Sequence, residues 1–114
     1  MKKPPTVSVF VPYYNDRNFL PQCIESILAQ TFKDFELVLL NHATTDDCRR
    51  IAHSFDDTRI VHIDMPSNLG AGSGMLILEF LKAASGKFAK LFCADDLMRP
   101  DCLEKLVGYM LKHP

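Results

Sequence analysis

The sequence predicts an α/β fold in which four strands alternate with four helices, β-α-β-α-β-α-β-α, and form a mostly parallel sheet with helices on both faces. Short apolar runs rich in β-branched and aromatic residues recur along the chain, and segments of helical period separate them. No repeat, low-complexity tract or linker interrupts this alternation. Because a strand, a helix and the next strand join as a right-handed unit with parallel strands, the whole pattern builds one sheet.

The first half of the chain supplies two of these strand and helix pairs. Residues 6–11 are a β-branched and aromatic run, which predicts a buried strand. Residues 20–28 have apolar side chains at offsets 0, 3, 4, 7 and 8, the pattern of one helix face. Residues 35–40 are a second apolar run of strand length, and residues 48–55 return to helical spacing.

The second half repeats the pattern. Residues 59–63 and 88–93 are the third and fourth predicted strands. Between them, residues 77–84 follow helical spacing, and a Ser-Gly pair directly after them is a typical helix end. Residues 103–111 repeat the 0, 3, 4, 7, 8 spacing and complete the alternation with a fourth helix.

Composition excludes several classes of protein. The chain has 114 residues, a length typical of one domain, and 47% of them are apolar, enough for a packed core. A net charge of -1, from 13 basic and 14 acidic side chains, argues against a nucleic-acid partner bound through bulk charge. No apolar run approaches the ~18 residues of a membrane span. We therefore expect a cytoplasmic protein without a transmembrane segment, and leave peripheral membrane association open.

The cysteines and histidines do not form a metal-binding pattern. The four cysteines are widely spaced, with no CxxC pair, and the four histidines show no HExxH or HxH arrangement. A zinc site needs close ligand pairs, so we expect reduced structural thiols instead.

The polar residues concentrate in the segments that follow the strands. In a parallel sheet, ligands bind beyond the carboxyl ends of the strands, where the strand order reverses. The candidate segments are residues 12–18, 41–47, 64–74 and 94–99. The function, where the sequence reveals it, lies in these four loops.

Two loops carry the clearest candidate chemistry. Asp95 and Asp96 directly follow the fourth strand, and adjacent carboxylates suit Mg²⁺ or Mn²⁺ together with substrate phosphates. A solvated acidic loop is the simpler alternative. Tyr14 and Asn15 offer a flat ring and an amide that suit a nucleobase, although both are ordinary loop residues. The glycines at 70–74 do not match a dinucleotide fingerprint, and a permissive helix start explains them better.

Together these residues resemble the amino-terminal, nucleotide-sugar-binding half of the family 2 glycosyltransferases, which have the Rossmann-like GT-A fold. The match lies in residues 7–15, 23–37, 44–46, 57–60, 68–70 and 94–96, followed by Pro100. These blocks stand in family order and at family spacing over nearly the whole chain. Residues 24–36 are especially close to the family's xSILxQTxxDFEL pattern.

The resemblance implies roles for individual residues. Pro12, Tyr14 and Asn15 match the segment that lines the base and ribose pocket. Asn41 stands where the family usually has an aspartate that hydrogen-bonds the base. Asp95 and Asp96 match the acidic motif that holds the divalent cation, Mg²⁺ or Mn²⁺, with Asp95 also on the nucleotide side. The residue that acts as base on the acceptor lies, in this family, after the portion present here.

Three departures from the family pattern concern the same loops. Residues 41–44 replace the family's Asp-Asp-Gly-Ser, so two carboxylates are missing. Cys93 stands where the acidic motif often begins with aspartate, and residues 75–76 are Met-Leu where the family tends to have Arg-Asn. These changes bear on which donor is bound.

The resemblance implies a metal-dependent transferase that moves a sugar from a nucleotide-diphosphate sugar, expected to be a UDP-sugar, to a hydroxyl of a saccharide or lipid-linked acceptor. The alternative is a catalytically silent module of the same fold that binds nucleotide or protein. Because a family 2 catalytic domain is about twice as long, we expect residues 1–114 to be a single, truncated donor-binding portion that does not transfer sugar alone.

Overall fold

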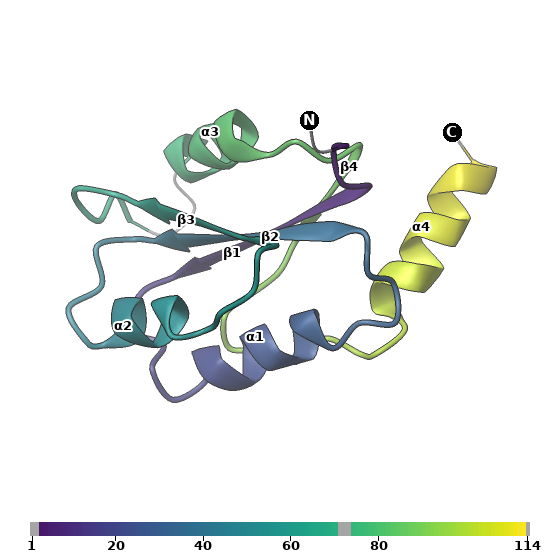
Figure 1. Ribbon diagram of the computed structural model, residues 1–114. Coiled ribbons are helices and arrows are strands. Elements are labelled where there is room, and N and C mark those ends of the chain that lie inside the picture. Colours follow the sequence, from purple (N-terminus) through teal and green to yellow (C-terminus); the bar gives the residue numbers. More distant parts are fainter. Residues whose placement is uncertain (1–2, 71–73, 114) are drawn as a thin grey trace.

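The computed structural model describes residues 3–70 and 74–113 and confirms the predicted α/β architecture (Figure 1). Its elements follow in the predicted order: β1 (Val7–Tyr13), α1 (Leu20–Leu28), β2 (Phe35–Asn41), α2 (Cys48–His53), β3 (Ile60–Asp64), α3 (Gly74–Ala83), β4 (Phe88–Leu91) and α4 (Cys102–Lys112). All strand pairs are parallel, and the strand order is β3-β2-β1-β4.

The strand order reverses beside β1. The chain steps from β1 to β2 and β3 in one direction and then crosses back to place β4 on the other side of β1. Right-handed crossovers then put α1 and α2 on one face and α3 on the opposite face, as Figure 1 shows. The carboxyl ends of β1 and β4 therefore flank the point at which a doubly wound sheet binds its ligand.

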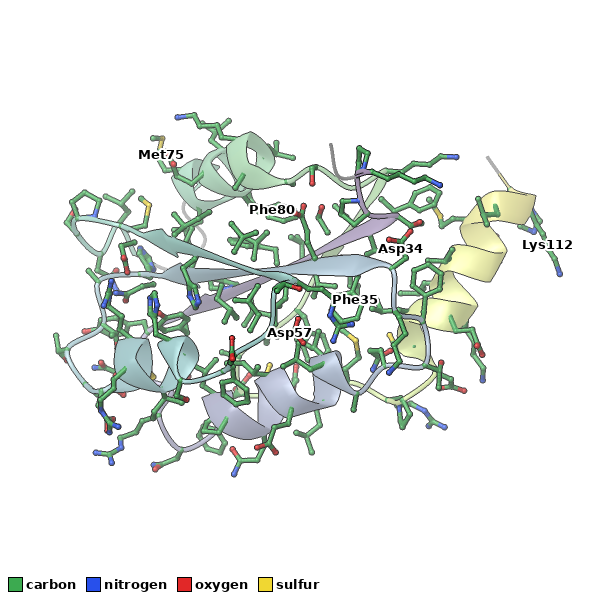
Figure 2. All side chains as sticks on the ribbon, viewed as in Figure 1. Asp34, Phe35, Asp57, Met75, Phe80 and Lys112 are labelled. Atoms are coloured by element: carbon green, nitrogen blue, oxygen red, sulfur yellow. The ribbon has the colours of Figure 1, made fainter. Side chains whose placement is uncertain are left out.

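Two cores hold the helices to the sheet. The larger lies under α1, α2 and α4 and includes Val9, Val11, Ile24 and Leu103, all completely buried. The smaller lies under α3, where the Phe80 ring points toward the sheet (Figure 2) and stacks on Phe10 at 4.5 Å between centroids. Burial of one such side chain contributes roughly 1.5–3 kcal/mol, so the two cores fix the loops at the sheet edge.

Two predicted strand ends differ from the structure by two residues, for different reasons, and the other predicted strand ends lie within one residue of the observed ones. The first strand runs on through Pro12 to Tyr13. The backbone N–H and C=O groups of the even-numbered residues of β1 point toward β4. The last residue of β4 in register is Leu91, opposite Phe10, so Pro12 lies beyond the paired part. The missing N–H of Pro12 therefore costs no hydrogen bond between these strands. The fourth strand ends at Leu91 instead of Cys93, and a turn follows it.

The structure also tests the simpler expectations from composition. All four cysteines are free, as predicted; Cys23 and Cys48 are buried, whereas Cys93 is exposed. Gly70 has φ +87°, a backbone conformation that favours glycine, but residues 71–73 of the same segment lie outside the described part of the chain. Among the described helices, none combines the length and apolar character needed to span a membrane.

Candidate functional site

The carboxyl ends of β1, β2 and β3 form one continuous edge. Tyr13 pairs in register with Asn41, and Asn41 pairs with Asp64. The loops that follow these three strands therefore begin side by side. Pro12, Tyr14, Asn15 and Asn41, which the sequence assigns to the nucleotide, all lie on this edge.

Asn15 joins the first loop to the second. Its Oδ1 atom accepts hydrogen bonds from the backbone N–H of Thr45 (2.9 Å) and from the hydroxyls of Thr44 and Thr45 (3.0 Å each). The Asn15 backbone N–H donates to the Thr44 hydroxyl at 2.8 Å. Asn15 adopts φ +51°, a left-handed conformation that asparagine tolerates better than most residues. This side chain therefore shapes the loop, and the neighbouring Tyr14 ring, 42% exposed, is left facing solvent.

Asn41 is held in place by two partners. Its Nδ2 group donates to Asp64 Oδ1 at 3.0 Å, and its Oδ1 atom accepts from the backbone N–H of Thr44 at 2.9 Å. The amide is buried, with 8% exposure. Its orientation is fixed, so any base contact by Asn41 must use its remaining N–H and lone pair.

Asp64 places a carboxylate next to Asn41, and the sequence analysis assigned it no role although it lies in the candidate segment 64–74. The Arg49 guanidinium donates to both of its oxygens, at 3.1 and 3.2 Å. These bonds, with the one from Asn41, lower the pKa of Asp64 despite partial burial. The signal in the sequence was an aspartate at the end of the third predicted strand. Only the strand order, in which β3 lies beside β2, shows that this aspartate is next to Asn41.

His42 also lies on this edge, within the candidate segment 41–47, and the sequence analysis assigned it no role. Its ring is 6% exposed, and Nε2 accepts a hydrogen bond from the backbone N–H of Leu69 at 2.8 Å. The Asn68 amide donates to the His42 carbonyl at 3.3 Å. The third loop is thereby attached to the second.

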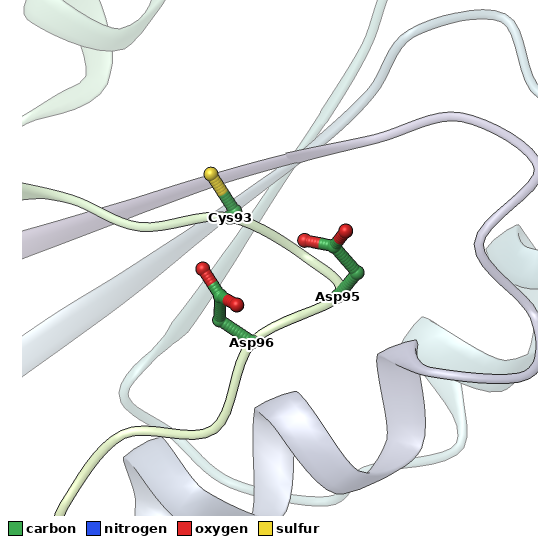
Figure 3. A group of neighbouring side chains, drawn as sticks. All are labelled: Cys93, Asp95 and Asp96. Atoms are coloured by element: carbon green, nitrogen blue, oxygen red, sulfur yellow. The ribbon is translucent and has the colours of Figure 1, made fainter.

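The acidic turn lies on the other side of β1. Asp95 and Asp96 are exposed, and their carboxylate oxygens and Cys93 Sγ lie within 4.8 Å of one another. The backbone N–H of Asp96 donates to the Cys93 carbonyl at 3.1 Å, which closes the turn. Figure 3 shows the three side chains on this turn. No hydrogen bond or ion pair within residues 3–70 and 74–113 engages either carboxylate.

This donor set fits the cation that the sequence predicts. Two exposed carboxylates offer hard oxygen ligands, and their exposure leaves room for the waters and phosphate oxygens that complete the shell of Mg²⁺ or Mn²⁺. The Cys93 thiol beside them is a softer ligand type.

The turn borders a hollow of about 480 Å³ at the point where the strand order reverses. Pro12 of β1, Cys93 and Asp95 of the turn, and Gly74 and Leu76 of α3 contribute to its wall. Two of the predicted residues, Pro12 and Asp95, therefore share one hollow. Tyr14, Asn15 and Asn41 lie outside its wall, toward β2 and β3.

Below the turn, Cys23 of α1 is completely buried. Burial, followed by the negative charges of Asp96 and Asp95, raises the pKa of the Cys23 thiol to about 12. The thiol therefore stays protonated, and it lies 3.5 Å from the Cys93 carbonyl, to which it donates. It serves as a buried donor and not as a metal-binding thiolate.

Comparison with known proteins matches both the fold and the sequence. The profile of glycosyl transferase family 2 matches residues 8–114. Glycosyltransferase GlyA of Streptococcus pneumoniae is 33% identical over 109 residues, which are 94% of this chain and 15% of that protein. TarS 1–349 of S. aureus, solved in complex with UDP, is 25% identical with a TM-score of 0.87, over 95% of this chain and 32% of that one. The mannosyltransferase PcManGT of Pyrobaculum calidifontis, solved with GDP-Man and Mn²⁺, has a TM-score of 0.81 at 24% identity, over 96% of this chain and 33% of that one.

The strand order and the layers of the doubly wound sheet match TarS, which confirms the Rossmann-like α/β fold of the GT-A type expected from the sequence. The chain belongs to glycosyl transferase family 2. It spans a third or less of each of these three proteins.

Proposed function

We propose that this chain forms the donor-binding portion of a glycosyltransferase that transfers a sugar from a nucleoside-diphosphate sugar to a hydroxyl of a saccharide or lipid-linked acceptor. The proposed donor is a UDP-sugar, and the proposed cofactor is Mg²⁺ or Mn²⁺ held by Asp95 and Asp96. Family membership and the fold support the reaction class. The complex of TarS with UDP supports the choice of base.

One observation carries the proposal. Asp95 and Asp96 are exposed, adjacent and without a described protein partner, and Asp95 borders the hollow at the reversal point of the sheet, whereas Asp96 lies outside its wall. A carboxylate that makes no bond within its own protein is available to an external cation. When bound, the cation neutralises the charge that develops on a diphosphate leaving group.

The remaining residues bind and orient the donor in this proposal. Tyr14 offers an exposed ring directly after β1, and it stacks on the base. Asn41, fixed by Asp64 and Thr44, presents its remaining amide hydrogen to the base. Pro12 and Asp95 border the space between the base and the phosphates.

Calorimetric titration of the chain with UDP, with and without Mn²⁺, tests the proposal. We expect UDP affinity to rise at least ~10-fold when Mn²⁺ is present, because Asp95 and Asp96 would hold a cation whose charge attracts the phosphates. Asp96→Ala should abolish that gain. Asp56→Ala is the matched control, because Asp56 is an exposed carboxylate at the opposite edge of the sheet and its loss changes the net charge equally.

Two outcomes contradict the proposal. If UDP, GDP and other nucleoside diphosphates all fail to bind, the donor site is wrongly assigned. If UDP binds with the same affinity regardless of Mn²⁺ and of Asp96→Ala, the metal assignment is wrong and the catalytically silent nucleotide-binding module is favoured.

A further inference from the structure

The segment between β4 and α4 has no regular structure of its own, although it carries the acidic turn. Residues 92–101 contain neither helix nor strand. The Phe92 N–H donates to the Phe10 carbonyl of β1 at 2.9 Å, but no helical or sheet ladder continues through Asp95 and Asp96. Further contacts come from α1 and from the residues that directly follow it.

Three polar side chains of α1 and its C-terminal end face this segment. Cys23 and Ser26 are spaced i and i+3 on α1, which places them on one side of the helix, and Gln30 lies two residues beyond the end of α1. Ser26 donates its hydroxyl hydrogen to the Cys23 carbonyl (2.7 Å) and accepts a hydrogen bond from the backbone N–H of Met98 (2.9 Å). Cys23 donates to the Cys93 carbonyl. The turn is thus held on both sides, at Cys93 before the carboxylates and at Met98 after them.

Gln30 holds the far end of the segment. Its side chain is completely buried, and its Nε2 group donates to the carbonyls of Ser26 (3.1 Å) and Arg99 (2.6 Å). Its Oε1 atom accepts from the backbone N–H of Leu103 at 3.0 Å, and the adjacent backbone N–H of Thr31 donates to Pro100 at 2.9 Å. Replacing a buried amide whose N–H groups and oxygen are all hydrogen-bonded is costly, because each lost bond leaves a buried backbone group without a partner.

We infer that Ser26 and Gln30 are positioning residues for the divalent cation: they fix the backbone of the acidic turn so that Asp95 and Asp96 present their carboxylates to one ion. This inference rests on the proposed function, since it assigns Asp95 and Asp96 to the cation. Neither residue belongs to the cluster of Cys93, Asp95 and Asp96. They act on it through the backbone at Met98, Arg99 and Leu103.

The negative charge of the turn explains why hydrogen bonds must hold its backbone. Asp95 and Asp96 carry like charges, and their oxygens lie within the same 4.8 Å cluster. A free loop would separate the two carboxylates, because like charges repel most strongly at short range. Hydrogen bonds from a rigid helix oppose that separation before the ion arrives, which lowers the cost of forming the site.

Mn²⁺ titration followed by electron paramagnetic resonance tests the inference, because the spectrum of free Mn²⁺ reports binding without any turnover. Loss of an outer partner typically weakens metal binding ~10–100-fold. We expect Gln30→Leu to fall in that range and Ser26→Ala at its lower end. Ser26→Thr keeps the hydroxyl and should bind Mn²⁺ more tightly than Ser26→Ala, close to the affinity of the wild type.

Ser54→Ala is the matched control. Ser54 donates to the Ile51 carbonyl at 2.6 Å, the same i to i−3 bond that Ser26 makes to Cys23, but it lies at the C-terminal cap of α2 and has no hydrogen bond to the acidic turn. We expect it to bind Mn²⁺ as the wild type does. Amide hydrogen exchange at Met98 should quicken in Ser26→Ala and stay unchanged in Ser54→Ala.

The outcomes separate the two claims. If the wild type binds no Mn²⁺, with or without UDP, the proposed function fails and the positioning role fails with it. If the wild type binds Mn²⁺ and folded Ser26→Ala binds it equally well, the positioning role alone is overturned. Should Gln30→Leu not fold, the Ser26→Ala and Ser26→Thr pair still decides between these results.

Discussion

The two halves of the carboxyl edge use their polar residues in opposite ways. At the ends of β1, β2 and β3, polar side chains bind one another or the neighbouring loops, as Asn15, Asn41 and Asp64 do. On the β4 side, Asp95 and Asp96 make no such bond within the described residues, and the backbone of their turn is held from below by α1. The first half builds its own shape, whereas the second presents charge to a ligand. A polar residue at a sheet edge is therefore informative about ligands only once its protein partners are known.

This difference predicts a contrast in stability, which is the largest effect expected from the comparison. Asn15→Ala removes the acceptor for three donors and places alanine at a left-handed position, so it should lower the free energy of unfolding by ~1–2 kcal/mol. The double variant Asp95→Asn and Asp96→Asn should stay within ~0.5 kcal/mol of the wild type, because no protein contact is lost. Urea unfolding measures both.

The reverse result would break the comparison. An unfolding free energy that drops more in the double aspartate variant than in Asn15→Ala would mean that the acidic turn is structural. Asn18→Ala serves as the control for the first measurement, since Asn18 is an exposed asparagine of the same loop.

The second prediction concerns acid sensitivity on the β3 side of the edge. His62 of β3 stacks on His53 of α2 with ring centroids 3.7 Å apart. Burial, and then the nearby His53, lower the pKa of His62, whereas Asp64 acts in the opposite direction and Arg49 in the same direction. The folded protein therefore favours neutral His62, and the unfolded chain binds the proton more readily.

The sign of the pH effect follows from that difference. The stability contributed by neutral His62 is fully present above the unfolded pKa of about 6.5 and is lost as the pH falls below it toward the lower folded value. We expect the urea midpoint to fall between pH 7.5 and pH 5, and to fall less in His53→Gln, which removes the neighbouring positive charge. A midpoint that is flat over this range, or equally steep in His53→Gln, contradicts the prediction.

The sequence predicted all eight elements because apolar periodicity alone identifies them. It placed Asp95 and Asp96 after a strand for the same reason. It could not foresee that Asp64 would lie against Asn41, or Gln30 against Leu103, since these contacts join residues 23 and 73 positions apart and depend on the strand order. The first strand was predicted too short because a proline normally ends a strand, and only the short neighbour β4 removes that penalty.

The smallest expected effect concerns Ala43, in the loop that follows β2. Ala43 has φ +57°, and the family's Asp-Asp-Gly-Ser pattern has glycine at this place, so the loop keeps a left-handed backbone although its residue has changed. A non-glycine residue there is strained by ~1–2 kcal/mol, while glycine costs ~0.5–1 kcal/mol more to order. Ala43→Gly should therefore raise the free energy of unfolding by about 0.5 kcal/mol, measured by urea unfolding. Ala52→Gly on α2 is the control with the same chemical change: it creates a helical glycine in the core and should destabilise by ~1 kcal/mol or more. If Ala43→Gly is as destabilising as Ala52→Gly, the strain is not real, and the first half of the edge reaches its shape through hydrogen bonds alone.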